Sequence, residues 1–166
     1  MELFDLVEGM VAEVCRDSYA VQAAAAVGVG EDGVLVDESL APLTPALAWF
    51  DPQRKEVFRT LRPMLTDDSF DAENDAFRTL VGWRWAREHV APGRAHCWIA
   101  LSDLVGALWS GSSFLSDTLA SRTGAWRSSD RRWDVGRVSL TLGRTELLPR
   151  VVPAGAVVGP LRSVRL

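Results

Sequence analysis

The sequence has 166 residues, of which 48% are apolar and 24% charged, a balance typical of one folded domain with a substantial core. Its net charge of −4 argues against a nucleic-acid-binding surface, which needs clustered basic residues. No stretch approaches the roughly 20 apolar residues of a membrane span. Cys15 and Cys97 are isolated thiols without the spacing of a disulfide framework. We therefore expect a single domain over residues 1–166 in a reducing cytoplasm, without nucleic-acid or membrane partners.

One helix and three short strands are expected before Asp51. Apolar residues at i, i+3, i+4 and i+7 spacing predict an amphipathic helix over residues 1–16. The small apolar run VQAAAAVGV (21–29) favours a buried strand, although its alanines also permit a helix. GVLVD (33–37) and PALAWF (45–50) indicate two further strands, joined by a polar connection that contains proline.

Helices dominate the prediction for the middle of the chain. Asp51 and Pro52 predict a helix start, with the carboxylate at the N-cap and proline at the first helical position. That helix should end before Pro63. The acidic sequence TDDSFDAEND (66–75) predicts a surface loop, and the apolar spacing after it predicts a helix over about 75–90.

The last third of the chain continues the alternation of strands and helices. CWIAL (97–101) predicts a strand that runs into Ser102 and Asp103, which are expected to cap the next helix. Shorter helices are expected around 116–123 and 133–142, before an extended tail rich in Val, Pro and Gly. Alternating strands and helices predict an α/β domain. The strands are few for the length of the chain, which indicates an incomplete sheet.

One candidate pocket combines an aromatic ring with carboxylates. Trp49 and Asp51 stand at the end of the third predicted strand, and the acidic pair Glu31 and Asp32 lies between glycines. An aromatic face covers the apolar C–H side of a sugar while carboxylates accept hydrogen bonds from its hydroxyls. Ligands of open α/β sheets bind at such strand ends. These four residues predict a site for a polyhydroxylated ligand, and ordinary packing of Trp49 is the competing interpretation.

Other site chemistries find little support. His89, His96 and Cys97 match no standard zinc spacing, so no metal site is expected. The chain has no G-x-S-x-G nucleophile motif. The glycines of GVGEDG form no G-x-G-x-x-G, and no Walker lysine follows them, so a phosphate-binding loop is not supported.

Four stretches, taken in order, carry a resemblance to a known family. Residues 27–54 are similar to the family's run of a strand, a substrate loop, a hairpin and a W-x-D-x-R segment. Residues 83–111 are similar to its run of a helix, a proline break, a strand and a Ser-Asp pair. SDTLASRTGAWRSSDRRWD (116–134) is similar to the pattern tDpSlASrTgl followed by Trp, and LLPRVVPAGAVVGPL (147–161) to LLPelvpsGevvG. Together the chain resembles the N-terminal domain of the FGGY family of carbohydrate kinases.

This resemblance implies a partial ribonuclease-H-like (actin-like ATPase) domain, with a mixed sheet and flanking helices. In the family, two such domains close over ATP and a sugar or polyol, Mg²⁺ holds the phosphates, and a carboxylate deprotonates the attacking hydroxyl. Trp49 matches the tryptophan that lines the sugar site, and Gly30, Glu31 and Asp32 fall on the substrate loop. The loop is of an acidic G-E-x-G kind, which leaves room for a substrate other than xylulose.

The chain also departs from the family pattern. No phosphate-loop hairpin of the Asp-x-Gly-Thr-Thr type precedes the first helix, and the catalytic aspartate is expected in a C-terminal domain beyond Leu166. Arg54 stands one position later than the arginine of the W-x-D-x-R motif, where Gln53 is found. ATP and Mg²⁺ are therefore expected to serve the complete enzyme. The isolated chain is expected to bind neither, to contain no catalytic residue and to be inactive.

The alternative is a catalytically inactive remnant that acts as a ligand-binding or self-associating interaction module. Missing strands expose a sheet edge and apolar faces, which favours pairing with a second copy or with a complementing chain. A homo-oligomer is therefore the partner expected beside the sugar or polyol.

Overall fold

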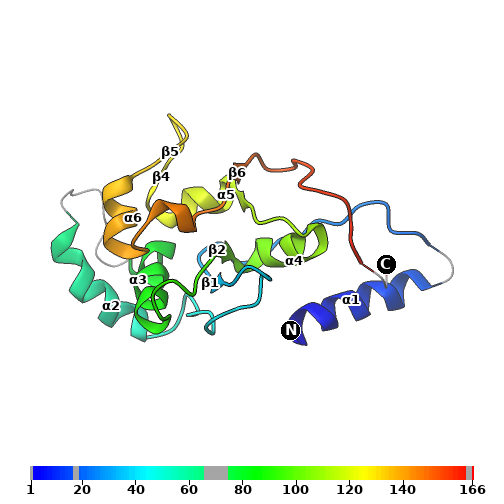
Figure 1. Ribbon diagram of the computed structural model, residues 1–166, viewed down its shortest axis with the longest axis horizontal. Coiled ribbons are helices and arrows are strands. Elements are labelled where there is room, and N and C mark those ends of the chain that lie inside the picture. The colour runs from blue at the N-terminus through cyan, green and yellow to red at the C-terminus, as the bar shows by residue number, and fades with distance from the viewer. Residues whose placement is uncertain (1, 17–18, 66–74, 164–165) are drawn as a thin grey trace.

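The computed structural model describes residues 2–16, 19–65, 75–163 and 166. The molecule is elongated, with helix α1 (Glu2–Cys15) and the C-terminal tail at one end and a cluster of helices at the other (Figure 1). The described helices contain no segment long and apolar enough to cross a membrane.

The centre of the fold is a two-stranded antiparallel ladder. Strand β1 (Gly33–Val36) pairs with β2 (Cys97–Ala100) so that Gly33 lies opposite Ala100. Both strands were expected from their apolar sequences, and both are almost completely buried. Side chains alternate between the two faces of such a ladder, which supplies each face with its own core.

Two hydrophobic clusters cover the two faces of this ladder. The larger cluster joins the ladder to helices α2 (Gln53–Leu61), α3 (Thr79–His89) and α6 (Val135–Thr141). Its largest members include Leu35, Phe58, Leu80, Trp83, Trp98 and Val138. The smaller cluster joins the opposite face to helix α4 (Leu101–Ser110) and includes Val34, Val36, Cys97, Ile99, Leu104 and Phe114.

The remaining strands form two short pairs among the described residues. Strand β3 (Leu115–Ser116) pairs in parallel with β6 (Val151–Val152), so the start of the tail is held beside the segment that follows α4. Strands β4 (Trp126–Arg127) and β5 (Arg132–Trp133) form a small antiparallel hairpin. The expected shortage of strands is therefore confirmed for the described part of the chain.

Two predicted strands are wrong. Residues 21–29 form an extended, exposed segment without a paired strand among the described residues, and the Val27 side chain is 98% exposed. Residues 45–48 are irregular and residues 49–50 form a turn, because the carbonyl oxygens of Leu47 and Ala48 accept hydrogen bonds from the side chain of Arg54 instead of from a neighbouring strand.

The predicted helices are found, with changes at their ends. Helix α2 begins one residue later than expected, because Pro52 rather than Asp51 is its N-cap, although the Asp51 carboxylate accepts a hydrogen bond from the Gln53 amide (2.8 Å) just before the helix. The helix ends at Leu61, as expected from Pro63. Helix α3 begins later than expected, at Thr79. The predicted loop at 66–75 lies outside the described residues except at its last position.

Helices in the last third follow the sequence more closely. Helix α5 (Asp117–Ala120) continues into a 3-10 turn within the range 116–123, and α6 is capped by the side chain of Asp134. Helix α4 begins at Leu101, one residue before the expected cap residues. Asp103 is therefore not a cap, and its carboxylate bonds to Ser116 instead.

Helix α1 packs through one side only. The Phe4 ring lies 6.1 Å from the Trp109 ring, and the Trp109 indole donates a hydrogen bond to the buried Glu8 carboxylate (3.1 Å). The other side carries four apolar residues that are each more than half exposed. They are Leu3, Leu6, Met10 and Val14.

Candidate functional site

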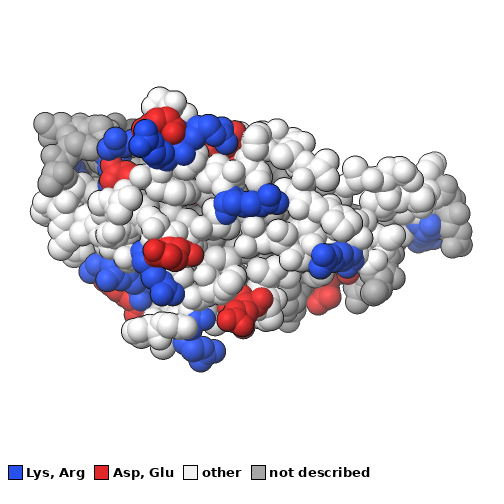
Figure 2. Space-filling view, turned by 45° about the horizontal axis from the view of Figure 1, so that its top comes forward, with Lys and Arg blue, Asp and Glu red and all other residues white. Residues whose placement is uncertain are grey.

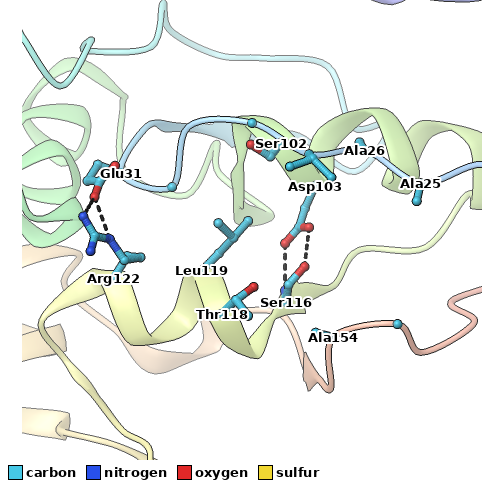
Figure 3. A pocket seen from close by; sticks show the side chains of 14 residues that line it. Ala25, Ala26, Glu31, Ser102, Asp103, Ser116, Thr118, Leu119, Arg122 and Ala154 are labelled. Carbon is cyan, nitrogen blue, oxygen red and sulfur yellow. Dashed lines mark hydrogen bonds and ion pairs between the residues drawn. The ribbon is translucent and has the colours of Figure 1, made fainter.

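A cavity of about 590 Å³ lies beside the exposed segment that precedes β1. One wall is backbone and small side chains of residues 25–31, and the opposite walls come from the start of α4, the α5 region and Ala154–Gly155 (Figure 3). Small-molecule sites in proteins have volumes of this order, about 300–1,000 Å³. This cavity is the candidate site.

Two glycines bring the wall segment close to its neighbours. A Cβ atom at Gly28 would lie 2.7 Å from the Ser102 hydroxyl oxygen, so the Ser102 side chain would have to move. A Cβ atom at Gly30 would lie 3.2 Å from Cγ of Arg122. The Ser102 hydroxyl donates to the carbonyl oxygen of Val29 (2.9 Å), which fixes the segment against α4. The Gly-Val-Gly sequence thus shapes the cavity through close approach of its backbone.

An ion pair closes one end of the cavity. Nε of Arg122 donates to Oε1 of Glu31 (2.7 Å), and Nη2 of the same guanidinium donates to that oxygen as well (Figure 3). The Glu31 side chain is 13% exposed and that of Arg122 is 55% exposed. Glu31 was predicted as a site residue. Arg122 was not, although it belongs to the ASRT stretch that carries the family resemblance.

A buried carboxylate forms the other end. Asp103 accepts hydrogen bonds from the backbone amide (2.7 Å) and the hydroxyl (2.5 Å) of Ser116. Burial raises the pKa of the Asp103 carboxyl, and the two bonds from Ser116 oppose that rise. Leu119 lies between the two ends, and the Thr118 hydroxyl lies beside it (Figure 3). The cavity therefore offers polar groups at both ends and an apolar middle.

Asp32 follows the cavity residue Glu31 in the chain and forms a buried pair with Arg54. The Arg54 side chain is 1% exposed, and its Nη2 donates to Oδ1 of Asp32 (3.2 Å). Burial raises the pKa of the Asp32 carboxyl, while a hydrogen bond from the Trp49 backbone and the charge of Arg54 oppose that rise. The carboxylate is thus engaged with protein donors.

Arg54 bonds to three of the four predicted site residues, and its guanidinium contacts both Glu31 and Asp32. It donates to the carbonyl oxygens of Glu31 (3.4 Å) and Ala48 (3.0 Å), and its own backbone amide donates to the carbonyl oxygen of Asp51 (3.0 Å). The displaced motif arginine is therefore the centre of this loop cluster. No local pattern apart from the motif itself predicts these contacts.

Trp49 lies on the surface near this cluster rather than in the packed core. Its side chain is 42% exposed and contacts Phe50 and Phe77 edge-on, with ring centroids 5.6 and 6.1 Å away. Among the predicted residues, Glu31 lines the cavity described above, while Trp49, Asp32 and Asp51 are not among its lining residues. The described residues contain no group of three or more His, Cys, Asp or Glu side chains placed to hold a metal ion.

Comparisons with known proteins agree on the family and the fold. The family model for the "FGGY family of carbohydrate kinases, N-terminal domain" matches residues 1–164. L-fuculokinase of Salmonella typhi is 26% identical over 140 residues, which cover 81% of this chain and 30% of that protein.

Two solved structures from Lactobacillus acidophilus, a gluconate kinase and a ligand-bound xylulose kinase, have TM-scores of 0.79 and 0.78. Each is 15% identical to this chain, and each match covers 98% of this chain and 34% of the kinase chain. The chain thus spans about a third of the length of its relatives. The predicted α/β domain of the actin-like ATPase fold is confirmed.

Proposed function

Because the chain belongs to the FGGY family of carbohydrate kinases and matches the N-terminal domain of that family, we propose that it forms the substrate-binding part of an ATP-dependent sugar or polyol kinase. The complete enzyme transfers the γ-phosphoryl group of ATP to a substrate hydroxyl. Residues 1–166 act as one domain in this proposal. A reducing cytoplasm is the proposed compartment, since both described thiols, Cys15 and Cys97, are free.

The observation that carries this proposal is the cavity with the Glu31–Arg122 pair at one end and Asp103 at the other. Its hydroxyl, carboxylate and guanidinium groups match the hydrogen-bonding needs of several substrate hydroxyls. Leu119 and the alanines of the wall segment match the apolar C–H faces of a short carbon chain. A small polyhydroxylated molecule satisfies both kinds of surface.

The four predicted residues keep distinct roles in this proposal. Glu31 contacts the substrate from the cavity wall, and the exposed ring of Trp49 offers an apolar face for a sugar at the neighbouring surface. Asp32 and Asp51 position these groups, because their carboxylates already accept hydrogen bonds from Arg54 and from the Gln53 amide.

In this proposal ATP and Mg²⁺ are held by other parts of the complete enzyme. Both cavity carboxylates are engaged, Asp103 by Ser116 and Glu31 by Arg122, and the described residues form no cluster suited to a metal. Neither carboxylate is therefore placed as a free general base. We propose that the 166-residue chain binds substrate, but neither ATP nor Mg²⁺, and that it transfers no phosphoryl group alone.

Ligand-observed NMR with a panel of pentuloses, hexuloses and polyols tests the proposal. We expect saturation transfer to at least one neutral sugar or polyol, with loss of that signal in Glu31→Ala. Glu56→Ala is the matched control, because Glu56 forms an exposed pair with Arg59 away from the cavity. ADP release measured with ATP and Mg²⁺ should stay at background. Absence of binding to every compound contradicts the substrate-binding role, and turnover contradicts the proposed inactivity.

A second candidate function, a self-associating or partner-binding module, is favoured by the outer side of α1. Leu3, Leu6, Met10 and Val14 lie there as one exposed apolar row, and such rows often mark interaction sites. Light scattering over a hundredfold range of concentration tests it. A rising mass that Leu6→Lys abolishes supports association, and a constant monomer mass contradicts it.

A further inference from the structure

The cavity holds no uncompensated positive charge. Its charged lining residues are Glu31, Asp103 and Arg122, two carboxylates and one guanidinium. The guanidinium is already bound twice to the Glu31 carboxylate. Protonation of Asp103 brings the lining to neutrality, and ionisation leaves one negative charge in excess, so in neither state is the lining positive.

Charges around the cavity do not change this balance. Arg54 is not a lining residue, and it is buried and paired with Asp32. Asp117, next to Ser116, accepts a hydrogen bond from the Ala154 amide (3.0 Å), and Arg131 lies 3.7 Å from its second oxygen. Basic and acidic side chains are also intermingled over the face of the molecule shown in Figure 2, without a patch of one sign.

The Glu31–Arg122 pair retains one unused group on each partner. The two hydrogen bonds of the pair use Oε1 of Glu31 together with Nε and Nη2 of Arg122. Within the described part of the chain, Oε2 of Glu31 and Nη1 of Arg122 have no hydrogen-bond partner. A hydroxyl group can donate to the first and accept from the second at the same time. A carboxylate can only accept, and it meets the negative charge of Glu31.

We propose that this cavity selects uncharged polyhydroxy compounds over sugar acids, with Glu31 and Arg122 as the specificity-determining pair. The inference rests on the proposed substrate-binding function and narrows it to neutral sugars and polyols. A sugar acid can accept a hydrogen bond from the unused Nη1 of Arg122, but Glu31 already balances the charge of that guanidinium. The acid therefore gains no net counter-ion and brings a second carboxylate beside Glu31. Like charges placed together in a binding site lower affinity strongly.

Paired titrations test the selectivity directly. D-glucitol and D-gluconate differ at one chain end, CH₂OH against carboxylate, and xylitol and D-xylonate form a second pair. We expect the 166-residue chain to bind each polyol at least about tenfold more tightly than its acid, since this ratio corresponds to a modest charge repulsion. Amide shifts in two-dimensional NMR give the dissociation constants.

Two variants move the charge balance in opposite directions. Glu31→Gln removes one negative charge and leaves Arg122 uncompensated, so the acid should gain affinity and the polyol-to-acid ratio should fall at least about tenfold. Arg122→Gln should weaken both ligands and raise the ratio. The Arg122 side chain is 55% exposed, so its replacement should leave the fold intact, which a thermal melt checks. Glu56→Gln makes the same chemical change at the exposed α2 pair and should leave the ratio unchanged.

The outcomes separate the two proposals. Equal or tighter binding of the acids by the unaltered chain, or an unchanged ratio in Glu31→Gln, overturns the charge selectivity and leaves the substrate-binding function standing. Failure of the chain to bind any polyol, acid or ketose overturns the substrate-binding function and the selectivity with it.

Discussion

Replacing Arg54 by Met should be among the most damaging single changes in this protein. The guanidinium donates to Asp32 and to the carbonyl oxygens of Leu47, Ala48 and Phe77, at 3.0–3.2 Å. Methionine fills much of the volume but leaves a buried carboxylate without its counter-ion. Removing one partner of a buried ion pair costs about 3–5 kcal/mol. This loss is a large fraction of the roughly 5–15 kcal/mol that stabilises a typical domain.

Urea unfolding followed by circular dichroism measures this effect. Adding Asp32→Asn to Arg54→Met should recover part of the loss, because the amide oxygen still accepts from the Trp49 backbone and carries no charge. Arg59→Met is the control, since its exposed pair with Glu56 contributes at most about 1 kcal/mol. A loss below about 1 kcal/mol in Arg54→Met would refute the reasoning, because buried charges cannot be left unpaired so cheaply.

Further predictions concern close backbone approach and a buried acid. Gly33→Ala should destabilise the fold by about 1–3 kcal/mol or more, because its Cβ would lie 2.1 Å from the Trp98 ring. Gly9→Ala should stabilise the fold by about 0.5–1 kcal/mol, because alanine favours the helix and its Cβ at this position of α1 meets no other atom. Thermal melts in which Gly33→Ala is the more stable of the two variants would contradict this reasoning. Burial raises the folded-state pKa of Asp103 above 3.8, so its contribution to the unfolding free energy is full below pH 3.8 and declines as the pH rises through the folded pKa. Asp103→Asn should lack that decline, and superimposable pH profiles of unfolding for the two proteins would show the reasoning to be wrong.

Local patterns in the sequence predicted the two central strands and most helices, because the signals that determine these elements are local, whereas the pairing of the strands was not predicted. The apolar runs of β1 and β2 are complete within four residues each, and Asp51 and Pro52 lie directly before the first residue of α2. The run at 45–50 looked equally like a strand. Its carbonyl oxygens instead bond to the side chain of Arg54, a contact that no periodicity reveals.

The candidate site was predicted only in part for the same reason. Glu31 was identified from its acidic, glycine-flanked loop, but its partner Arg122 is 91 residues away in the sequence. Asp103 was interpreted as a helix cap because it follows a strand, and its bond to Ser116 depends on how α4 and β3 pack. Residues 21–29 show the opposite error, since apolar sequence alone predicted burial where the described fold provides no pairing strand.

The most direct test of the account is to map a bound polyol onto the chain by amide chemical shifts. If the cavity binds a polyhydroxylated substrate, a neutral polyol such as xylitol, titrated to saturation, should shift the amide signals of Gly28–Glu31 and of Ser116–Arg122, which form two walls of the cavity. Saturable shifts confined to other surfaces, or no shifts with any polyol, ketose or aldose of the panel, would contradict it.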